Sequence, residues 1–424
     1  MPDEATTGRV SVARAEAARP RGPATHNVEL RSAAVEEAVA DVCEATVSPD
    51  LFCDAKVVVK PNVFMPHAPA TTDPRVTGGV IAWLLSAGAR EVVVAEESSI
   101  STHIGRGSST AEALAHTGYD RLVAGFESPR VRLAELRSEG DGPTPVHSGL
   151  VLREVRYPRL LASADRLVNV PVLKFHLQTL ITNAVKNTWS AAEPLLRTLN
   201  HCWTLAAALL DAHYLRPPDL TVVDALQPLT GDHSFGEPLD RRLVMASTDS
   251  IALDALGAWM LGFDDPSEIE TVRLGASTGL GEGDLEAIRV EGVAKEDLPR
   301  TERPEVPCVP ADFPPLQIEW HCGRKVGGGC IAYTTAGLRA LMQKAEGELG
   351  RWHVFIGEAP EEPDDLGDPG DRIVFIGACS LQGQVFRNVQ RRLYLGRRSD
   401  DLIIIPACPP MALRTEIMRL VGLD

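Results

Sequence analysis

Short runs of Val, Leu and Ile recur along the chain, and polar residues do not alternate with apolar ones inside them. Such a run indicates a strand that is buried on both faces, as in a parallel sheet covered by helices. Residues 76–87 have helical periodicity and stop at Gly88, a residue that favours helix ends. The sequence therefore predicts an α/β fold, a mostly parallel sheet flanked by helices, with strands at 55–59, 91–95, 166–170, 220–223 and 243–246.

Prolines cluster within 297–315, which predicts a linker between two domains. Before it we expect a flexible, polar N-terminal tail (1–28) and a large α/β domain (29–296). After it we expect a second, smaller α/β domain (316–424). Its expected strands are 316–320, 353–357, 373–376 and 402–405, and its expected helices are 334–348, 384–393 and 411–420.

Charge and hydropathy narrow the range of partners. The 424 residues carry a net charge of −16, which repels phosphate backbones and argues against a nucleic-acid partner. No stretch of about 18 apolar residues occurs, and the first 28 residues contain no apolar core, so we expect no membrane span and no export signal. A cytoplasmic location is the expectation, with the eight cysteines as thiols or metal ligands instead of disulfides.

Polar residues gather where the predicted strands end. Lys60 and Asn62 follow the first strand, Lys174 and His176 follow the third, and Asp224 follows the fourth. Residues 247–249 follow the fifth, and Asp249 is placed to cap the next helix. Because parallel strands end at one edge of a sheet, where α/β proteins bind ligands, these residues form a candidate site.

Residues 173–190 are the most informative polar stretch. Interpreted as a helix, the stretch has one apolar face and a ridge of polar residues at i,i+4 spacing that includes Asn183, Lys186 and Asn187. One interpretation is a solvated face, and the other is an amide and lysine surface that holds an anionic or carbonyl ligand. On the second interpretation Lys174, His176 and Lys186 are candidate catalytic residues, and the candidate substrate-binding residues are Lys60, Asn62, Asn183, Asn187 and Asp224.

Several ordered motifs over residues 50–265 resemble one known family, called domain of unknown function 362 (DUF362). They are Val59-Lys60-Pro61-Asn62, Thr71-Thr72-Asp73-Pro74, Asn169 to His176, Thr182 to Asn187, Val222-Val223-Asp224, Thr230 to Gly236 and Ser247 to Asp254. The resemblance implies the family's α/β fold and little chemistry, because the family has no settled activity. Members often carry ferredoxin-like cysteine runs, and this chain has none.

Four cysteines lie in the predicted C-terminal domain. Cys322, Cys379 and Cys408 follow or end predicted strands, and Cys330 closes a glycine-rich loop at a helix start. Convergence of four thiolates is what an iron–sulfur cluster requires. The Cys408-Pro409-Pro410 step is also similar to one that carries a cluster ligand in small subunits of respiratory complex I and nickel–iron hydrogenases. The four cysteines are widely spaced in the sequence, which favours a four-iron four-sulfur (4Fe-4S) cluster over zinc. Zinc stays the alternative.

Three functions remain open from the sequence. The leading one is an iron–sulfur protein that acts as a redox enzyme, or a cluster-assisted lyase or isomerase, on a small anionic molecule, together with a redox partner protein. The second is a metal-free enzyme with Cys330 as nucleophile. The third is a non-catalytic binding protein with structural zinc. No phosphate loop, dinucleotide fingerprint or Ser-centred nucleophile elbow is present.

Overall fold

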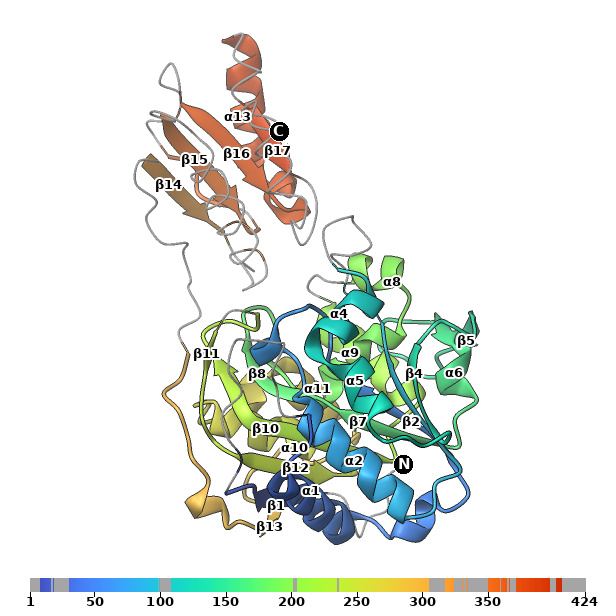
Figure 1. Cartoon of the computed structure of the whole chain (residues 1–424). Coiled ribbons are helices and arrows are strands. Elements are labelled where there is room, and N and C mark those ends of the chain that lie inside the picture. The colour runs from blue at the N-terminus through green and yellow to red at the C-terminus, as the bar shows by residue number, and fades with distance from the viewer. Residues whose placement is uncertain are drawn as a thin grey trace. The chain divides into compact units, whose positions relative to one another are not determined.

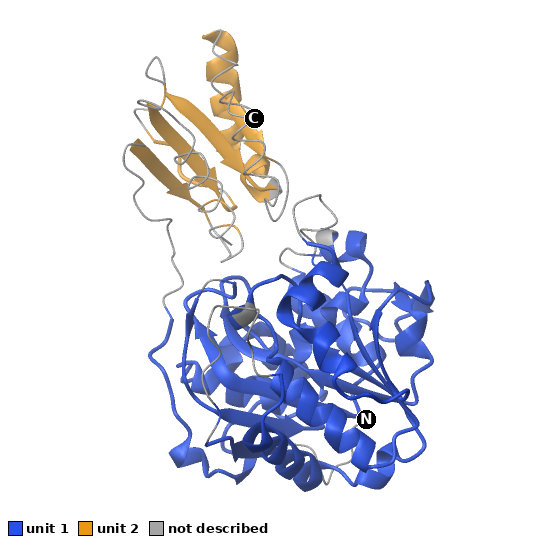
Figure 2. Cartoon of the chain, viewed as in Figure 1, with its two compact units in different colours: residues 1–200, 204–304 blue, residues 201–203, 305–424 orange. Residues whose placement is uncertain are grey.

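The computed structural model divides the chain into two compact units (Figure 2): unit 1 is residues 1–200 and 204–304, and unit 2 is residues 201–203 and 305–424. The division falls within the segment expected to be a linker. The structure describes residues 8–16, 18, 30–97, 99, 108–200, 204–234, 236–304, 317–323, 330, 334, 350–358, 360–363, 366, 371–396 and 402–405.

Unit 1 is built on one large sheet (Figure 1). Its main path runs β13 (Arg289–Gly292), β1 (Arg9–Arg14), β12 (Leu243–Ser247), β10 (Leu220–Thr230), β7 (Arg166–Val170), β2 (Lys56–Pro61), β3 (Glu91–Glu96) and β4 (Val131–Glu135). The five strands from β10 to β4 are mutually parallel, whereas β12 runs antiparallel to both β10 and β1. The predicted fold class, a mostly parallel sheet flanked by helices, is confirmed.

Both faces of this sheet are buried, as the unbroken apolar runs predicted. Val57 and Val59 pack into a core with the helices α1 (Ala33–Thr46), α2 (Pro74–Ser86), α4 (Thr110–Thr117) and α5 (Tyr119–Ala124). Val58 points to the opposite face and is also fully buried. That side carries α9 (Leu205–Leu215), α10 (Ser250–Met260) and α11 (Glu270–Ser277), of which α10 contacts β12.

Smaller elements complete unit 1. They are β5 (Asp141–Pro145), β6 (Glu154–Pro158), β11 (Glu237–Pro238), α6 (Arg159–Ala162), α8 (Pro194–Leu199), η1 (Pro49–Phe52), η2 (Ala68–Ala70), η4 (Pro266–Glu268) and η5 (Lys295–Asp297). Among the residues that the structure describes, no helix has the length and apolar character needed to cross a lipid bilayer.

The residues that cap the helices α2 and α10 lie where the sequence indicates. Asp73 accepts the amide hydrogen of Arg75 at the start of α2, and Gly88, just after its end, has φ +83°. Asp249 accepts the amide hydrogens of Ile251 and Ala252, so it caps α10 as predicted.

Two expectations about unit 1 are wrong. Within the expected flexible tail 1–28, residues Arg9–Arg14 form β1, which lies inside the sheet between β12 and β13. Val10 and Val12 are buried there, so the apolar residues of this short segment are used as core. Ser247 and Asp249 also do not join the candidate site, because β12 is antiparallel to β10 and therefore ends at the opposite edge of the sheet.

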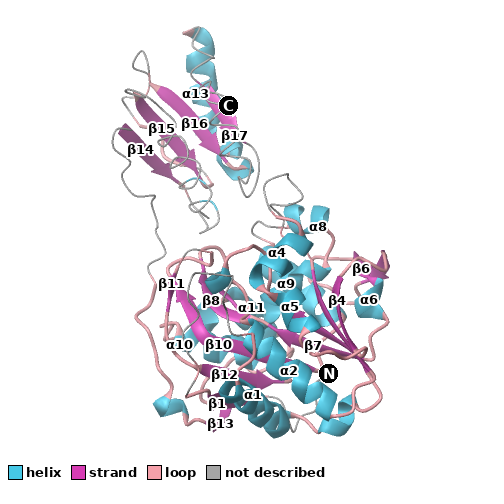
Figure 3. Ribbon diagram, in the orientation of Figure 1, coloured by secondary structure: helices cyan, strands magenta, loops and turns pink. Residues whose placement is uncertain are grey.

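The helix expected over residues 173–190 is wrong as well. The segment forms the strand β8 (Val172–His176), which is labelled in Figure 3. The strand β9 (Leu180–Thr182) and the single turns α7 (Ala184–Asn187) and η3 (Thr188–Ala191) follow it along the chain. β8 pairs with β10 and with β9. Pairing to the long strand β10 supplies backbone hydrogen bonds that outweigh the helical spacing of the apolar residues.

Unit 2 contains a four-stranded parallel sheet in the order β14 (Gln317–Cys322), β15 (Arg351–Ile356), β16 (Arg372–Ile376) and β17 (Leu402–Ile405). Strand β16 leads through η6 (Ala378–Gln382) into α13 (Gln384–Leu395). Phe355 and Phe375 form a core with Val389 and Leu393 of α13. The second α/β domain is therefore present, whereas the expected helices 334–348 and 411–420 lie almost entirely outside the described residues.

Candidate functional site

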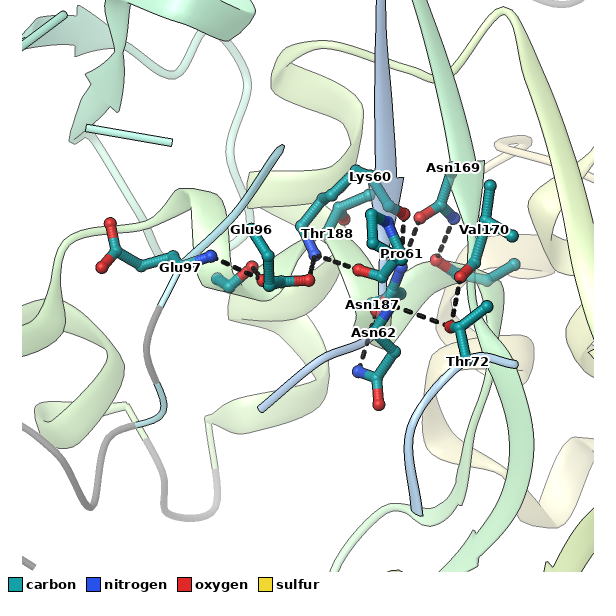
Figure 4. A network of polar contacts seen from close by, with 12 residues as sticks. Lys60, Pro61, Asn62, Thr72, Glu96, Glu97, Asn169, Val170, Asn187 and Thr188 are labelled. Atoms are coloured by element: carbon teal, nitrogen blue, oxygen red, sulfur yellow. Dashed lines mark hydrogen bonds and ion pairs between the residues drawn. The ribbon is translucent and has the colours of Figure 1, made fainter. Parts of the chain in front are cut away.

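A buried ion pair lies at the carboxyl ends of β2 and β3 (Figure 4). Lys60 Nζ donates to Glu96 Oε2 at 2.8 Å, and both side chains are at most 3% exposed. The Ser190 hydroxyl and the Glu97 amide hydrogen donate to the other oxygen of Glu96. Burial lowers the pKa of Lys60, and Glu96 partly offsets this effect. The charge of Lys60, a predicted substrate-binding residue, is thus matched inside the protein.

A chain of side-chain amides connects the ends of β8, β2 and β7. Lys174 Nζ donates to Asn62 Oδ1 at 3.0 Å, and Asn62 Nδ2 donates to Asn187 Oδ1 at 2.9 Å. Asn187 Nδ2 donates to Asn169 Oδ1 at 2.8 Å, and Asn169 Nδ2 donates to the carbonyl of Ala184. Each amide orients the next, so this chain fixes where the ammonium group of Lys174 lies.

Lys174 and Lys186 are two cationic side chains that no carboxylate neutralises directly. Lys174 Nζ also donates to the Ala70 carbonyl at 2.6 Å and lies 4.3 Å from the centre of the Phe64 ring. Neither lysine forms an ion pair with any carboxylate among the described residues. Burial, reinforced by the charge of Lys186, holds the pKa of Lys174 well below its usual range. Burial also lowers the pKa of Lys186 to about 8, with a further effect of Arg197.

Two imidazole rings lie beside these lysines. His176 stacks on His233 with 4.4 Å between ring centres, and His233 in turn stacks on Phe64. His176 Nδ1 accepts the amide hydrogens of Gln178 and Thr179 in the β8–β9 turn, so its ring proton is on Nε2. Burial and the charge of Lys174 lower the pKa of His233, which is therefore neutral at neutral pH.

The remaining predicted residues hold the backbone around the site. Asp224 accepts the amide hydrogens of Asp73 and Leu226, and it is 3% exposed. Asn183 is fully buried and donates to the carbonyl of Leu253 on α10, while its Oδ1 has no hydrogen-bond partner among the residues that the structure describes. These hydrogen bonds of Asp224 and Asn183 therefore go to neighbouring backbone and not to the lysines.

The structure thus brings Lys174, His176, Lys186 and Asn62 together, with Asn187 behind them in the amide chain. Sequence reasoning missed four neighbours: Phe64, Glu96, Asn169 and His233. Asn169, a polar residue inside the apolar run of β7, was a usable signal. His233 was visible only as part of the glycine-bearing family motif.

Unit 2 holds the cysteines predicted to bind a cluster. Cys322 ends β14 and is exposed, Cys379 lies in η6 just after β16, and Cys330 is half-buried. Cys408 lies outside the described residues. In the described part of the chain, the group of His, Cys, Asp or Glu side chains whose ligating atoms all lie within 4.8 Å of one another is instead Glu319, His321 and His353. Cluster thiolates bind different iron atoms and need not approach one another so closely.

The sheet of unit 1 is covered by helices on both faces, and charged side chains gather at the ends of its parallel strands. The protein is therefore of the α/β class, in which ligands bind at the carboxyl ends of the strands. Residues 57–259 match the model of the family described as Domain of unknown function (DUF362). The resemblance seen in the sequence is therefore confirmed, and the matched segment contains every site residue of unit 1.

Individual proteins show more distant similarity. The thylakoid-associated protein sll1697 of Synechocystis sp. is 25% identical over 235 residues, which are 53% of this chain and 68% of that protein. The lactate racemase apoprotein from Thermoanaerobacterium thermosaccharolyticum has a TM-score of 0.38 and 12% identity, over 92% of this chain and 79% of that one. A Thermotoga maritima protein has a TM-score of 0.34 and 12% identity, over 91% and 82% of the two chains.

Proposed function

We propose that the protein is an enzyme that acts on a small anionic molecule. Unit 1 contains the substrate site, in which this molecule binds between Lys174 and Lys186. The observation that carries this proposal is a pair of lysine amino groups, buried Lys174 and half-buried Lys186, that have no carboxylate ion-pair partner among the described residues. Lys60, two residues before the Asn62 that accepts from Lys174, has such a partner in Glu96. This difference in pairing supports an anionic ligand as the partner of Lys174 and Lys186.

The physical reason is the cost of burying charge. An ammonium group removed from water loses several kcal/mol of solvation, and folding tolerates this only if other groups compensate. Lys174 is compensated by neutral oxygens and an aromatic ring, and one of its three N–H groups stays available. A carboxylate or phosphate placed between the lysines would complete the compensation with charge-assisted hydrogen bonds.

Neighbouring polar atoms support the same proposal. Thr182 Oγ1 and His233 Nδ1 are buried and have no hydrogen-bond partner in the described structure. Thr182 is the cross-strand partner of Lys174, so its hydroxyl belongs to the same region. Buried polar atoms are normally paired, and unpaired ones mark places where water or a ligand binds.

The site also offers groups that move protons. With a pKa of about 8, Lys186 exchanges its proton near neutral pH, which suits a general acid or base. His176 presents its Nε2–H, and His233 is a neutral imidazole. Proton transfer next to a bound carboxylate or carbonyl is the chemistry of lyases and isomerases, and it also accompanies many redox reactions.

The first experiment is a calorimetric titration of the full chain with phosphate, acetate and malonate at constant ionic strength. We expect at least one anion to bind, and its affinity to fall roughly tenfold between about pH 7 and about pH 9, because Lys186 loses its proton as pH rises through about 8. Affinity that is constant over this window, or binding of none of the three anions, would contradict the proposal.

For unit 2 we propose a 4Fe-4S cluster bound by Cys322, Cys330, Cys379 and Cys408, which would make the protein a redox enzyme or a cluster-assisted lyase or isomerase. Two positions support it: β14 and β16 are parallel strands on either side of β15, and Cys322 and Cys379 follow their carboxyl ends. The residues there are thiols at one sheet edge, which fits thiolate ligation.

The test is the metal content of protein purified without oxygen. We expect brown protein with iron and acid-labile sulfide, and loss of colour when any one of the four cysteines is replaced by Ser. Zinc that is lost in the same variants would favour the structural-zinc alternative, and protein without metal at these cysteines would leave Cys330 as a candidate nucleophile. Either result would contradict the cluster.

A further inference from the structure

Glu319, His321 and His353 lie on one face of the unit 2 sheet. Glu319 and His321 are two residues apart on β14, so their side chains leave the strand on the same side. His353 of β15 is the in-register neighbour of Glu319, which puts it on that side too. β14 is the edge strand of the described sheet, and both of its residues in this group are half-buried.

The ligating atoms of the three side chains all lie within 4.8 Å of one another. His321 Nε2 lies 3.1 Å from His353 Nδ1, and Glu319 Oε2 lies 3.3 Å from the same nitrogen. Metal–ligand bonds of about 2.0–2.2 Å at tetrahedral or octahedral angles place neighbouring ligand atoms about 3–3.5 Å apart. The two distances to His353 Nδ1 therefore match the spacing of ligands around one ion.

A carboxylate orients the buried imidazole from behind. His353 is fully buried, and its Nε2 lies 3.4 Å from Asp371 Oδ2. An N–H on Nε2 that faces Asp371 leaves the lone pair of Nδ1 directed toward Glu319 and His321. Such a carboxylate behind a histidine is the usual support of a metal-binding imidazole. The ring of His321 is held in turn by stacking on Phe355 at 4.5 Å.

A polar cluster without an ion is the competing explanation. Arg351 pairs with Glu319, and the two imidazoles can share one proton. One proton between the rings, however, leaves the Glu319 oxygen facing a nitrogen lone pair at 3.3 Å whenever Nδ1 is the acceptor. A cation satisfies all three atoms at once.

We propose that Glu319, His321 and His353 bind a divalent first-row transition metal ion, with Asp371 as a positioning residue. Two imidazoles and one carboxylate suit zinc, iron(II), cobalt(II) and nickel(II), and they leave at least one coordination position for water or another ligand. It uses none of the residues of the four-cysteine set or of the anion site of unit 1.

The test is titration of metal-stripped full-length protein with zinc(II) by calorimetry and with cobalt(II) by absorption. We expect visible cobalt bands that persist in Cys322→Ser, a background that removes one of the four cysteines and so weakens any ion held by the thiolates. His321→Ala, a change at a half-buried position, should weaken zinc binding by more than about tenfold, and Asp371→Asn by about 10- to 100-fold. The control His147→Ala changes an exposed histidine of unit 1 and should leave the affinity unchanged.

Circular dichroism of each variant shows whether it is folded, and His353→Ala is avoided because that side chain is fully buried. The proposal is overturned if folded His321→Ala binds zinc as tightly as the unchanged protein. It is also overturned if all cobalt absorption is lost in folded Cys322→Ser, because the ion would then belong to the cysteines alone.

Discussion

Replacing Lys60 by Met is expected to lower the free energy of unfolding by about 3–5 kcal/mol, the largest stability effect of any change considered for this protein. The ammonium of Lys60 lies 2.8 Å from Glu96, and both side chains are almost completely buried. Removal of the lysine leaves the carboxylate of Glu96 in the interior without its counter-charge. Ser190 and the Glu97 amide still donate to Glu96, but neither carries a positive charge.

Urea unfolding measures this loss. The double variant Lys60→Met with Glu96→Gln should recover much of it, since a neutral amide still accepts from Ser190 and no buried charge remains. Lys56→Met is the matched control: its Nζ lies 3.9 Å from Glu139, whose side chain is 39% exposed, and such pairs contribute at most about 1 kcal/mol. Equal losses for Lys60→Met and Lys56→Met would show that the buried pair is not a stabilising unit.

The strands and the α/β class could be predicted because burial on both faces leaves a direct trace in the sequence. β7 and β17 have the predicted bounds, since each is a short, mainly apolar run that follows an aspartate and ends before a proline. Strand direction leaves no such trace. β12 looks like its neighbours in composition, and only its pairing with β1 and β10 reveals that it is antiparallel. Ser247 and Asp249 were therefore assigned to the wrong edge of the sheet.

Local periodicity also failed where tertiary pairing decided the structure. The apolar residues of 173–190 have helical spacing in the sequence. In the structure, however, Lys174 pairs with Leu229 of β10 and with Thr182 of β9. Leu180 adopts φ +62° in the turn between β8 and β9, which a helix does not permit. The short strand β1 was missed because a single six-residue run in a polar segment gives too little periodic signal.

For the candidate site, the sequence identified the residue types but not their pairings. Lys60, Lys174 and Lys186 were grouped together as ligand-binding lysines. The structure distinguishes them, because Lys60 faces Glu96 from the neighbouring strand and the other two face neutral groups. This difference depends on the order of strands β2 and β3 in the sheet, which no residue of either strand encodes.

The second large effect is expected from Lys186→Met, which should weaken anion binding by about 10- to 100-fold and should not destabilise the fold. The loss follows from removing a charge-assisted hydrogen bond of about 1.5–3 kcal/mol. The pKa of Lys186 in the folded protein, about 8, is below the ordinary lysine value of 10.5. The unfolded chain therefore binds more protons between these two values, and stability rises with pH across that window.

It follows that the protonated lysine opposes folding at neutral pH. Lys186→Met removes this opposition and should raise the free energy of unfolding on the order of 1 kcal/mol near neutral pH, after allowance for partial exposure. The gain should shrink as pH rises above about 8, because the lysine then becomes neutral in the folded state. A structural lysine would give the opposite result, a destabilised variant at every pH.

The most direct measurement is the calorimetric titration of the unchanged protein, Lys186→Met and Lys295→Met with the anion that binds, at the same pH and ionic strength. Lys295 is a unit 1 lysine that pairs with Glu286 and donates to the Leu285 carbonyl, so its replacement removes one charge without touching the proposed site. We expect Lys295→Met to bind like the unchanged protein and Lys186→Met to bind at least about tenfold more weakly. Equal affinity in the two variants, with Lys186→Met folded, would contradict an anion site between Lys174 and Lys186.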